Sequence, residues 1–336
     1  MKRLFLLPFV LTVSICASSV RAGGQPPTRL THLTLQLKWF PQAQFAGYFV
    51  AHDLGFYRRQ GLDVSILPGG PTITPEDRVR DGVADIGVDW LPALLVARDH
   101  GANLTNIAQI FQASGMRLIT FRSTGIQRIA QLRGKRVGVW FAGNQYQFYA
   151  LMSRYDMSPP QQYMTVVPED FTMRQFLTHQ IDAGNAMTYN ELGILYEHGV
   201  RPSQLTIFDY NELGVSVLED GLFARPNWLR SHQSIAVRFL RASIQGWKWA
   251  VAHPNQAGMI SYRHESAGYS SPAHQMYMAR QVALLVTHGL GNQHTIGYMD
   301  PSLYARTWGI LRREQVIRTI PHSAYDQQYW AAAGGY

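Results

Sequence analysis

Residues 33–41 read Leu-Thr-Leu-Gln-Leu-Lys-Trp-Phe-Pro, a short apolar run followed directly by two aromatic residues and a proline. The run predicts a β-strand over Leu33–Lys38. Trp39 then lies on a loop at the carboxyl end of this strand. In open α/β sheets, ligands bind where loops leave the carboxyl ends of strands. The same nine residues therefore predict a strand and a first candidate binding residue.

Working outward, short apolar runs alternate with longer helical patterns along the rest of the chain, which is typical of an α/β protein. A threonine before Pro75, Glu76 and Asp77 predicts a helix start. The clearest helix is predicted over Asn227–His253, with Pro254 ending it. The further strands that we predict are Val64–Leu67, Ile86–Asp89, Leu118–Phe121, Val137–Phe141, Thr165–Val167, Ile181–Met187 and Leu205–Phe208.

The order of these runs predicts two α/β lobes around a cleft. We expect residues 23–122 and 216–336 to form lobe 1 and residues 123–215 to form lobe 2. The chain then crosses between the lobes twice, and two crossings make a hinge.

The first 22 residues resemble a cleavable secretory signal. Lys2 and Arg3 precede a short apolar core, and small residues around Ala22 suit cleavage. We therefore expect a periplasmic protein. A lipid anchor at Cys16 is the alternative, although the bulky Ile15 fits such a site poorly. Because Cys16 is the only cysteine, cleavage would exclude cysteine nucleophiles and Cys-ligated metals from the mature chain.

Composition and motifs argue against several function classes. The chain has 336 residues, a net charge of +8, and no basic run interleaved with aromatic residues, so we expect no nucleic-acid partner. The sequence lacks a GxSxG elbow, a phosphate-binding loop and a GxGxxG fingerprint. His264 has no second histidine four residues away, as a helical zinc motif requires. We therefore expect no catalytic residues, no cofactor and no metal.

Aromatic, amide and carboxylate side chains instead gather after four of the predicted strands. Aromatic rings stack on flat ligands, while carboxylates and amides bind ring NH and amino groups. Core packing of the tryptophans, a helix start at Glu191 and an exposed ring at Tyr146 are the alternative interpretations. The candidate binding residues are Trp39, Asp89, Trp90, Asn144, Tyr146, Tyr189, Asn190 and Glu191.

Several stretches carry a resemblance to a known family. The opening 35–41, then Ala46–Ala51, Gly55–Tyr57 and Gly61–Val64, resemble the start of ABC-importer solute-binding proteins, in the branch shared with fungal thiamine-pyrimidine synthases. The likeness extends through residues 134–140, 176–183 and 227–254. The resemblance implies a type II periplasmic binding fold, in which a monomer closes on a small molecule and presents it to a membrane permease.

Within that branch, the sequence is similar to binders of a formylaminopyrimidine, a thiamine precursor, and of related flavin-like heterocycles. The resemblance implies stacking by Trp39 and stacking or polar contact by Tyr189 and Glu191. Asp89 and Asn144 are added by the strand-end argument and not by the resemblance.

Two other functions share the fold. The fungal synthases hold pyridoxal phosphate on a lysine and consume a histidine, but the matching positions here are Asp89 and Ala93. Their cysteine-rich segment corresponds to residues 214–221, which contain no thiol. An aspartate cannot form a Schiff base, so we expect no synthase activity. Binding of an alkanesulfonate, taurine or nitrate is disfavoured because Glu191 would repel an anion. Riboflavin binding stays open.

Overall fold

The computed structural model describes residues 29–141, 143–265, 268, 270–287, 295–322 and 324–335. The expected signal segment, with Cys16 and the cleavage position at Ala22, lies outside these residues. None of the helices in the described ranges is both long and apolar enough to span a bilayer.

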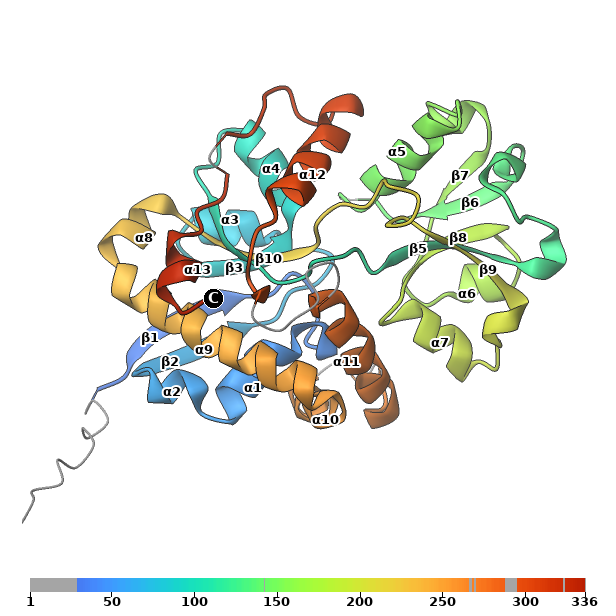
Figure 1. Ribbon diagram of the computed structural model, residues 1–336. Coiled ribbons are helices and arrows are strands. Elements are labelled where there is room, and N and C mark those ends of the chain that lie inside the picture. The colour runs from blue at the N-terminus through green and yellow to red at the C-terminus, as the bar shows by residue number, and fades with distance from the viewer. Residues whose placement is uncertain are drawn as a thin grey trace, which may run out of the picture.

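Two five-stranded sheets lie side by side, each packed against helices (Figure 1). The first has the order β2-β1-β3-β10-β4, and the second the order β7-β6-β8-β5-β9. The first is built from β1 (Thr31–Gln36), β2 (Leu62–Leu67), β3 (Ile86–Trp90), β4 (Thr105–Gln109) and β10 (Asp220–Ala224). The second is built from β5 (Met116–Phe121), β6 (Arg136–Val139), β7 (Thr165–Pro168), β8 (Ala183–Met187) and β9 (Leu205–Asp209).

In each sheet, the strand that comes directly after a crossing runs antiparallel to both of its neighbours. β5 pairs antiparallel with β8 and β9, and β10 pairs antiparallel with β3 and β4. The chain crosses between the sheets after β4 and again after β9. The predicted two-lobe α/β fold with two crossings is therefore confirmed.

The position of the first crossing differs from our expectation. A lobe 1 that ends at residue 122 would include β5, whereas the hydrogen bonds of β5 place it in the second sheet. An apolar run predicts a strand but says nothing about which strands will pair with it.

All eight predicted strands are present, with ends that differ by a few residues, but β4 and β10 were not predicted. Their sequences, Thr-Asn-Ile-Ala-Gln and Asp-Gly-Leu-Phe-Ala, are not apolar runs, yet every residue in both strands is buried. Buried polar groups need hydrogen bonds, and the Gln109 side-chain amide donates to the Glu219 carbonyl at 2.8 Å. Tertiary partners therefore stabilise these two strands.

The helices around the first sheet are α1 (Ala46–Asp53), α2 (Phe56–Arg59), α3 (Pro75–Arg80), α4 (Leu91–Asp99), α8 (Pro226–Ser231), α9 (Gln233–Ala252), α10 (Pro254–His264), α11 (Pro272–Thr287), α12 (Pro301–Arg313) and α13 (Gln328–Ala332). The second sheet carries α5 (Tyr146–Arg154), α6 (Arg174–Leu177) and α7 (Glu191–Glu197). Short 3-10 turns occupy η1 (Ala43–Phe45), η2 (Arg122–Thr124), η3 (Ile129–Leu132), η4 (Pro160–Gln162) and η5 (Pro202–Gln204).

The single helix predicted over Asn227–His253 is two helices. α8 ends at Ser231 and α9 begins at Gln233, because His232 between them leaves the helical conformation with φ −127°. Pro254 does end α9, but it also occupies the first turn of α10. A proline is compatible with the first turn of a helix because its missing N–H has no partner there.

A close helix contact positions the entry to the cleft. α1 packs against α9, where a Cβ on Gly246 would lie 2.1 Å from the Gly47 carbonyl oxygen. Only glycine permits this approach. α1 follows η1 directly, so the contact anchors the segment that carries Gln42 and Gln44 toward the second lobe.

Candidate ligand-binding cleft

A cavity of about 70 Å³ lies between the two lobes, at the carboxyl ends of strands from both sheets. Its walls come from the loop after β1 and the last residue of β3 in the first lobe, and from the segments that follow β6, β7 and β8 in the second, with the last residue of β8. The lining residues are Lys38, Trp39, Gln42, Gln44, Trp90, Trp140, Asn144, Phe171, Met187, Tyr189, Asn190 and Glu191. A second cavity, of about 500 Å³, shares Trp39, Gln42, Phe171 and Asn190 with it.

The structure brings six of the eight candidate residues to this inner cavity: Trp39, Trp90, Asn144, Tyr189, Asn190 and Glu191. Asp89 does not line the cavity, because its carboxylate turns to Lys38 and to the Trp90 backbone N–H. Tyr146 lines a different cavity, of about 490 Å³, beside α3 and α4. It is the first residue of α5, and its ring packs against the hydrophobic cluster of the first lobe.

A buried ion pair lies beneath the first-lobe side of the cavity. Lys38 Nζ is 2.7 Å from Asp89 Oδ1, and these side chains are 18% and 7% exposed. Burial by itself would lower the pKa of Lys38, but the Asp89 carboxylate, with Asp220 and Glu76 nearby, raises it above its ordinary value. The ammonium also lies 4.9 Å from the centre of the Trp90 ring. Lys38 is therefore held as a cation facing an aromatic wall.

A chain of side-chain hydrogen bonds runs along the same first-lobe side of the cavity. Gln42 donates to the Gln44 side-chain oxygen at 2.8 Å, and Gln44 donates to both oxygens of Asp220 at 3.1 and 2.9 Å. Burial raises the pKa of Asp220 to about 8. The sequence analysis missed these three residues and Lys38. Three of the four lie within five positions of Trp39, so proximity to the predicted loop was the available signal.

The carboxyl group of the second lobe has a different environment. Glu191 begins α7, and its Oε2 accepts a bond from the Met187 backbone N–H at 2.9 Å, while its Oε1 accepts one from the Asn190 amide at 2.8 Å. Burial raises the pKa of Glu191 to about 7. The alternative interpretation of Glu191 as a helix start is thus correct, and the same residue also lines the cavity.

Aromatic rings close the outer side of the cavity. The ring centroids of Trp39 and Phe171 are 4.8 Å apart at an interplanar angle of 62°, so a first-lobe ring meets a second-lobe ring edge to face. Phe171 also contacts Trp140, at 5.7 Å and 30°. Neither Trp140 nor Phe171 was predicted. Trp140 follows β6 as Trp39 follows β1, which was a usable signal, whereas nothing in the sequence marked Phe171.

These residues provide flat apolar walls, amide groups on both sides of the cavity and the Glu191 carboxyl group on the second-lobe side. Such a site stacks a planar ring and accepts hydrogen bonds from its NH and amino groups. A larger cavity, of about 610 Å³, lies between α5 and α12 and is lined by Arg154, Arg306 and Arg313 with small residues. It contains none of the candidate binding residues.

Comparison with known proteins gives a family match and consistent fold matches. The family model described as "NMT1/THI5 like" matches residues 42–257. The riboflavin-binding protein RibY of Chloroflexus aurantiacus is 24% identical, over 91% of this chain and 87% of its own. A putative thiamine biosynthesis protein of Haemophilus influenzae is 23% identical, over 73% and 77% of the two chains.

The structure of a putative periplasmic sulfonate-binding protein, SsuA, from Methylobacillus flagellatus has a TM-score of 0.68 at 14% identity, over 90% of this chain and 94% of its own. The last match supports the periplasmic binding fold.

Proposed function

Because the chain belongs to the NMT1/THI5-like family, we propose that it is a periplasmic solute-binding protein that delivers a thiamine-related pyrimidine to an ABC importer. The supporting observation is the cavity between the lobes, in which rings from both lobes surround buried carboxyl and amide groups. A ligand seated there touches both lobes at once, so its binding favours the closed arrangement. A membrane permease then receives the closed, loaded protein.

The dimensions of the cavity favour a single ring. Drug-sized ligands occupy pockets of roughly 300–1,000 Å³, and the inner cavity is about 70 Å³. We infer that a single-ring ligand such as a formylaminopyrimidine enters when the lobes open and enlarge this space. Its amino group would donate to Glu191, and its ring would stack on Trp39. The eight candidate residues therefore divide into six contact residues, one supporting residue (Asp89) and one residue outside the site (Tyr146).

A flavin is the second candidate ligand, because the match to RibY covers nearly the whole chain. Its three fused rings would have to extend past Phe171 into the adjoining cavity of about 500 Å³. Synthase activity is not proposed. The position that matches the synthase lysine is Asp89, whose carboxylate is bound to Lys38, and Lys38 is engaged in the same pair.

A ligand panel tests the proposal on the chain that begins at Gly23. Thermal unfolding is measured with formylaminopyrimidine, hydroxymethylpyrimidine, thiamine, riboflavin, taurine, an alkanesulfonate and pyridoxal phosphate. A ligand at a hundred times its Kd adds about 2.7 kcal/mol to the free energy of unfolding. We expect the formylaminopyrimidine to raise Tm most. A shift with riboflavin alone would transfer the proposal to the second candidate, and a shift with only a sulfonate would contradict the heterocycle assignment.

A further inference from the structure

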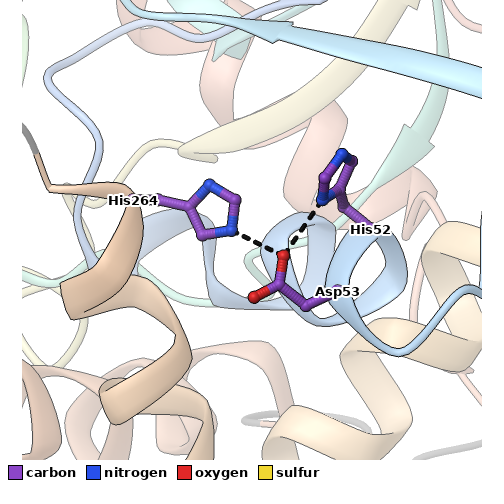
Figure 2. A group of neighbouring side chains, drawn as sticks. All are labelled: His52, Asp53 and His264. Carbon is purple, nitrogen blue, oxygen red and sulfur yellow. Dashed lines mark hydrogen bonds and ion pairs between the residues drawn. The ribbon is translucent and has the colours of Figure 1, made fainter.

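Two histidines and an aspartate from the ends of two first-lobe helices point toward one another (Figure 2). His52 and Asp53 are the last two residues of α1, and His264 is the last residue of α10. Asp53 and His264 are 211 positions apart in the sequence, so no local spacing could have indicated the cluster. Within the described part of the chain, the possible ligand atoms of these three residues all lie within 4.8 Å of one another.

The geometry converges on one oxygen. His52 Nδ1 lies 3.0 Å from Asp53 Oδ1, and His264 Nε2 lies 2.8 Å from the same oxygen. Ligand atoms around a tetrahedral Zn²⁺, bonded at about 2.1 Å, lie roughly 3.4 Å apart. Each nitrogen therefore lies about half an ångström closer to Oδ1 than in a zinc site, and all three ligand atoms lie within 4.8 Å of one another. Small rotations of the three side chains would let an ion enter between them.

Neighbouring groups hold these ligands in place. The His264 ring stacks on Phe49, with centroids 4.5 Å apart and planes 13° apart, which orients Nε2 toward Asp53. The Arg263 guanidinium binds Asp53 Oδ2 at 3.2 Å and leaves Oδ1 to face the histidines. Hydrogen bonds of this kind to a ligating carboxylate orient it for a metal.

Charged groups of both signs surround the cluster. Arg263 opposes a bound cation, whereas the carboxylate and the carboxyl ends of two helices attract one. The His52, Asp53 and His264 side chains are 49%, 21% and 25% exposed. Water can therefore reach the centre of the cluster and complete the coordination of an ion.

We propose that His52, Asp53 and His264 form a binding site for a divalent transition metal ion of the Zn²⁺ type. Two imidazoles and one carboxylate suit Zn²⁺, Ni²⁺ or Cu²⁺ rather than Mg²⁺ or Ca²⁺, which prefer oxygen ligands only. The ion joins the end of α1 to the end of α10 within the first lobe. None of the three residues lines either cavity between the lobes, and the assignment does not depend on the identity of the transported solute.

Titration calorimetry with ZnCl₂ on the untagged, metal-free protein tests the site. We expect one Zn²⁺ per chain and a rise in Tm of at least about 2 °C at saturation. His264→Ala and His52→Gln should each weaken Zn²⁺ binding by at least about tenfold. The matched control is His253→Ala, which removes an exposed histidine at the end of α9 and should leave Zn²⁺ binding unchanged. MgCl₂ should produce neither heat nor a shift in Tm.

The absence of Zn²⁺ binding to the unmodified chain would overturn the proposal. So would variants His264→Ala and His52→Gln that both bind Zn²⁺ as strongly as the unmodified chain. His52→Gln guards against misfolding as an explanation, because the His52 side chain is half exposed and its replacement leaves the stacking of His264 on Phe49 in place.

Discussion

The two lobes hold carboxyl groups of different character beside the cleft: Glu191 lines the cavity, whereas Asp89 lies behind Lys38. In the first lobe, Asp89 is paired with Lys38 at 2.7 Å, so a buried negative charge faces a buried positive charge. In the second lobe, Glu191 is held by one backbone N–H and one amide, and among the described residues no Lys, Arg or His bonds to it. Asp89 and Glu191 are both buried, but Asp89 forms an ion pair with Lys38, whereas the pKa of Glu191 is raised to about 7.

This difference indicates separate tasks for the two sides. The Asp89 carboxylate raises the pKa of Lys38, so the ammonium stays charged and its 2.7 Å contact with Asp89 fixes the first-lobe side of the cavity. An unpaired carboxyl group can gain or lose a proton when a ligand replaces water beside it. We therefore expect the Lys38–Asp89 pair to hold the first-lobe side in one shape, and Glu191 to respond to the hydrogen-bonding character of the ligand. Asp220, whose pKa burial raises to about 8, is a first-lobe carboxyl group that can also change its protonation state.

Removal of the ion-pair cation should have the largest effect. Lys38→Met leaves Asp89 buried with only the Trp90 backbone N–H as a partner, beside the acidic groups of Asp220 and Glu76. We expect the free energy of unfolding to fall by about 3–5 kcal/mol, measured by urea denaturation of the ligand-free protein at pH 7.

Two further variants check this prediction. Lys38→Met combined with Asp89→Asn removes both charges and should recover most of the lost stability. Lys248→Met, on α9, should change the free energy of unfolding by less than about 0.5 kcal/mol. A loss in Lys38→Met no larger than in the Lys248 control would mean that the ion pair does not stabilise the first lobe.

The second-lobe carboxyl group predicts a dependence of stability on pH. Glu191 has a pKa of about 7 in the folded chain and an ordinary value of 4.5. The folded state holds this proton more tightly, so the contribution of Glu191 to stability is greatest below about pH 4.5 and is lost as pH rises through 7. Glu191→Gln has no such proton. The stability of the unmodified chain relative to this variant should therefore fall by about 3 kcal/mol between pH 4.5 and 8.

Urea denaturation at several pH values measures this difference, with the exposed Glu212→Gln as the control. Glu219 and Asp220, whose pKa values burial raises to about 7 and about 8, titrate in all these variants and cancel in the comparison. A difference between the unmodified chain and Glu191→Gln that stays constant with pH would place the carboxylate in a solvated environment and remove the contrast between the lobes.

The smallest effects are expected at the aromatic contact between the lobes. Trp39→Ala should weaken binding of the stabilising panel ligand by about 1–3 kcal/mol, by analogy with the stacking of bases on aromatic residues. Phe171→Ala removes the partner ring, which is 41% exposed, and should cost about 0.5–1.5 kcal/mol. Calorimetric Kd values compare the two. A larger loss for Phe171→Ala than for Trp39→Ala would assign the main stacking surface to the second lobe.

Much of the candidate site could be anticipated because it depends on strand ends. Trp39, Trp90 and Tyr189 follow predicted strands, and loops at the carboxyl ends of strands in two facing sheets meet in a cleft. The residues that were missed depend on partners far away in the sequence. Asp220 belongs to β10, a strand with no apolar pattern, and it reaches Gln44 across 176 positions.

The sequence alone determined the class of fold and the positions of the aromatic loops, because both follow from short runs of neighbouring residues. It could not determine the pairing of β5, the burial of Asp89 against Lys38 or the meeting of His52 with His264. The residues that meet here are far apart in the sequence: Lys38 and Asp89 by 51 positions, and Asp53 and His264 by 211. Only the packed tertiary structure decides such contacts, because local patterns specify which residues are buried and not which distant residues they meet.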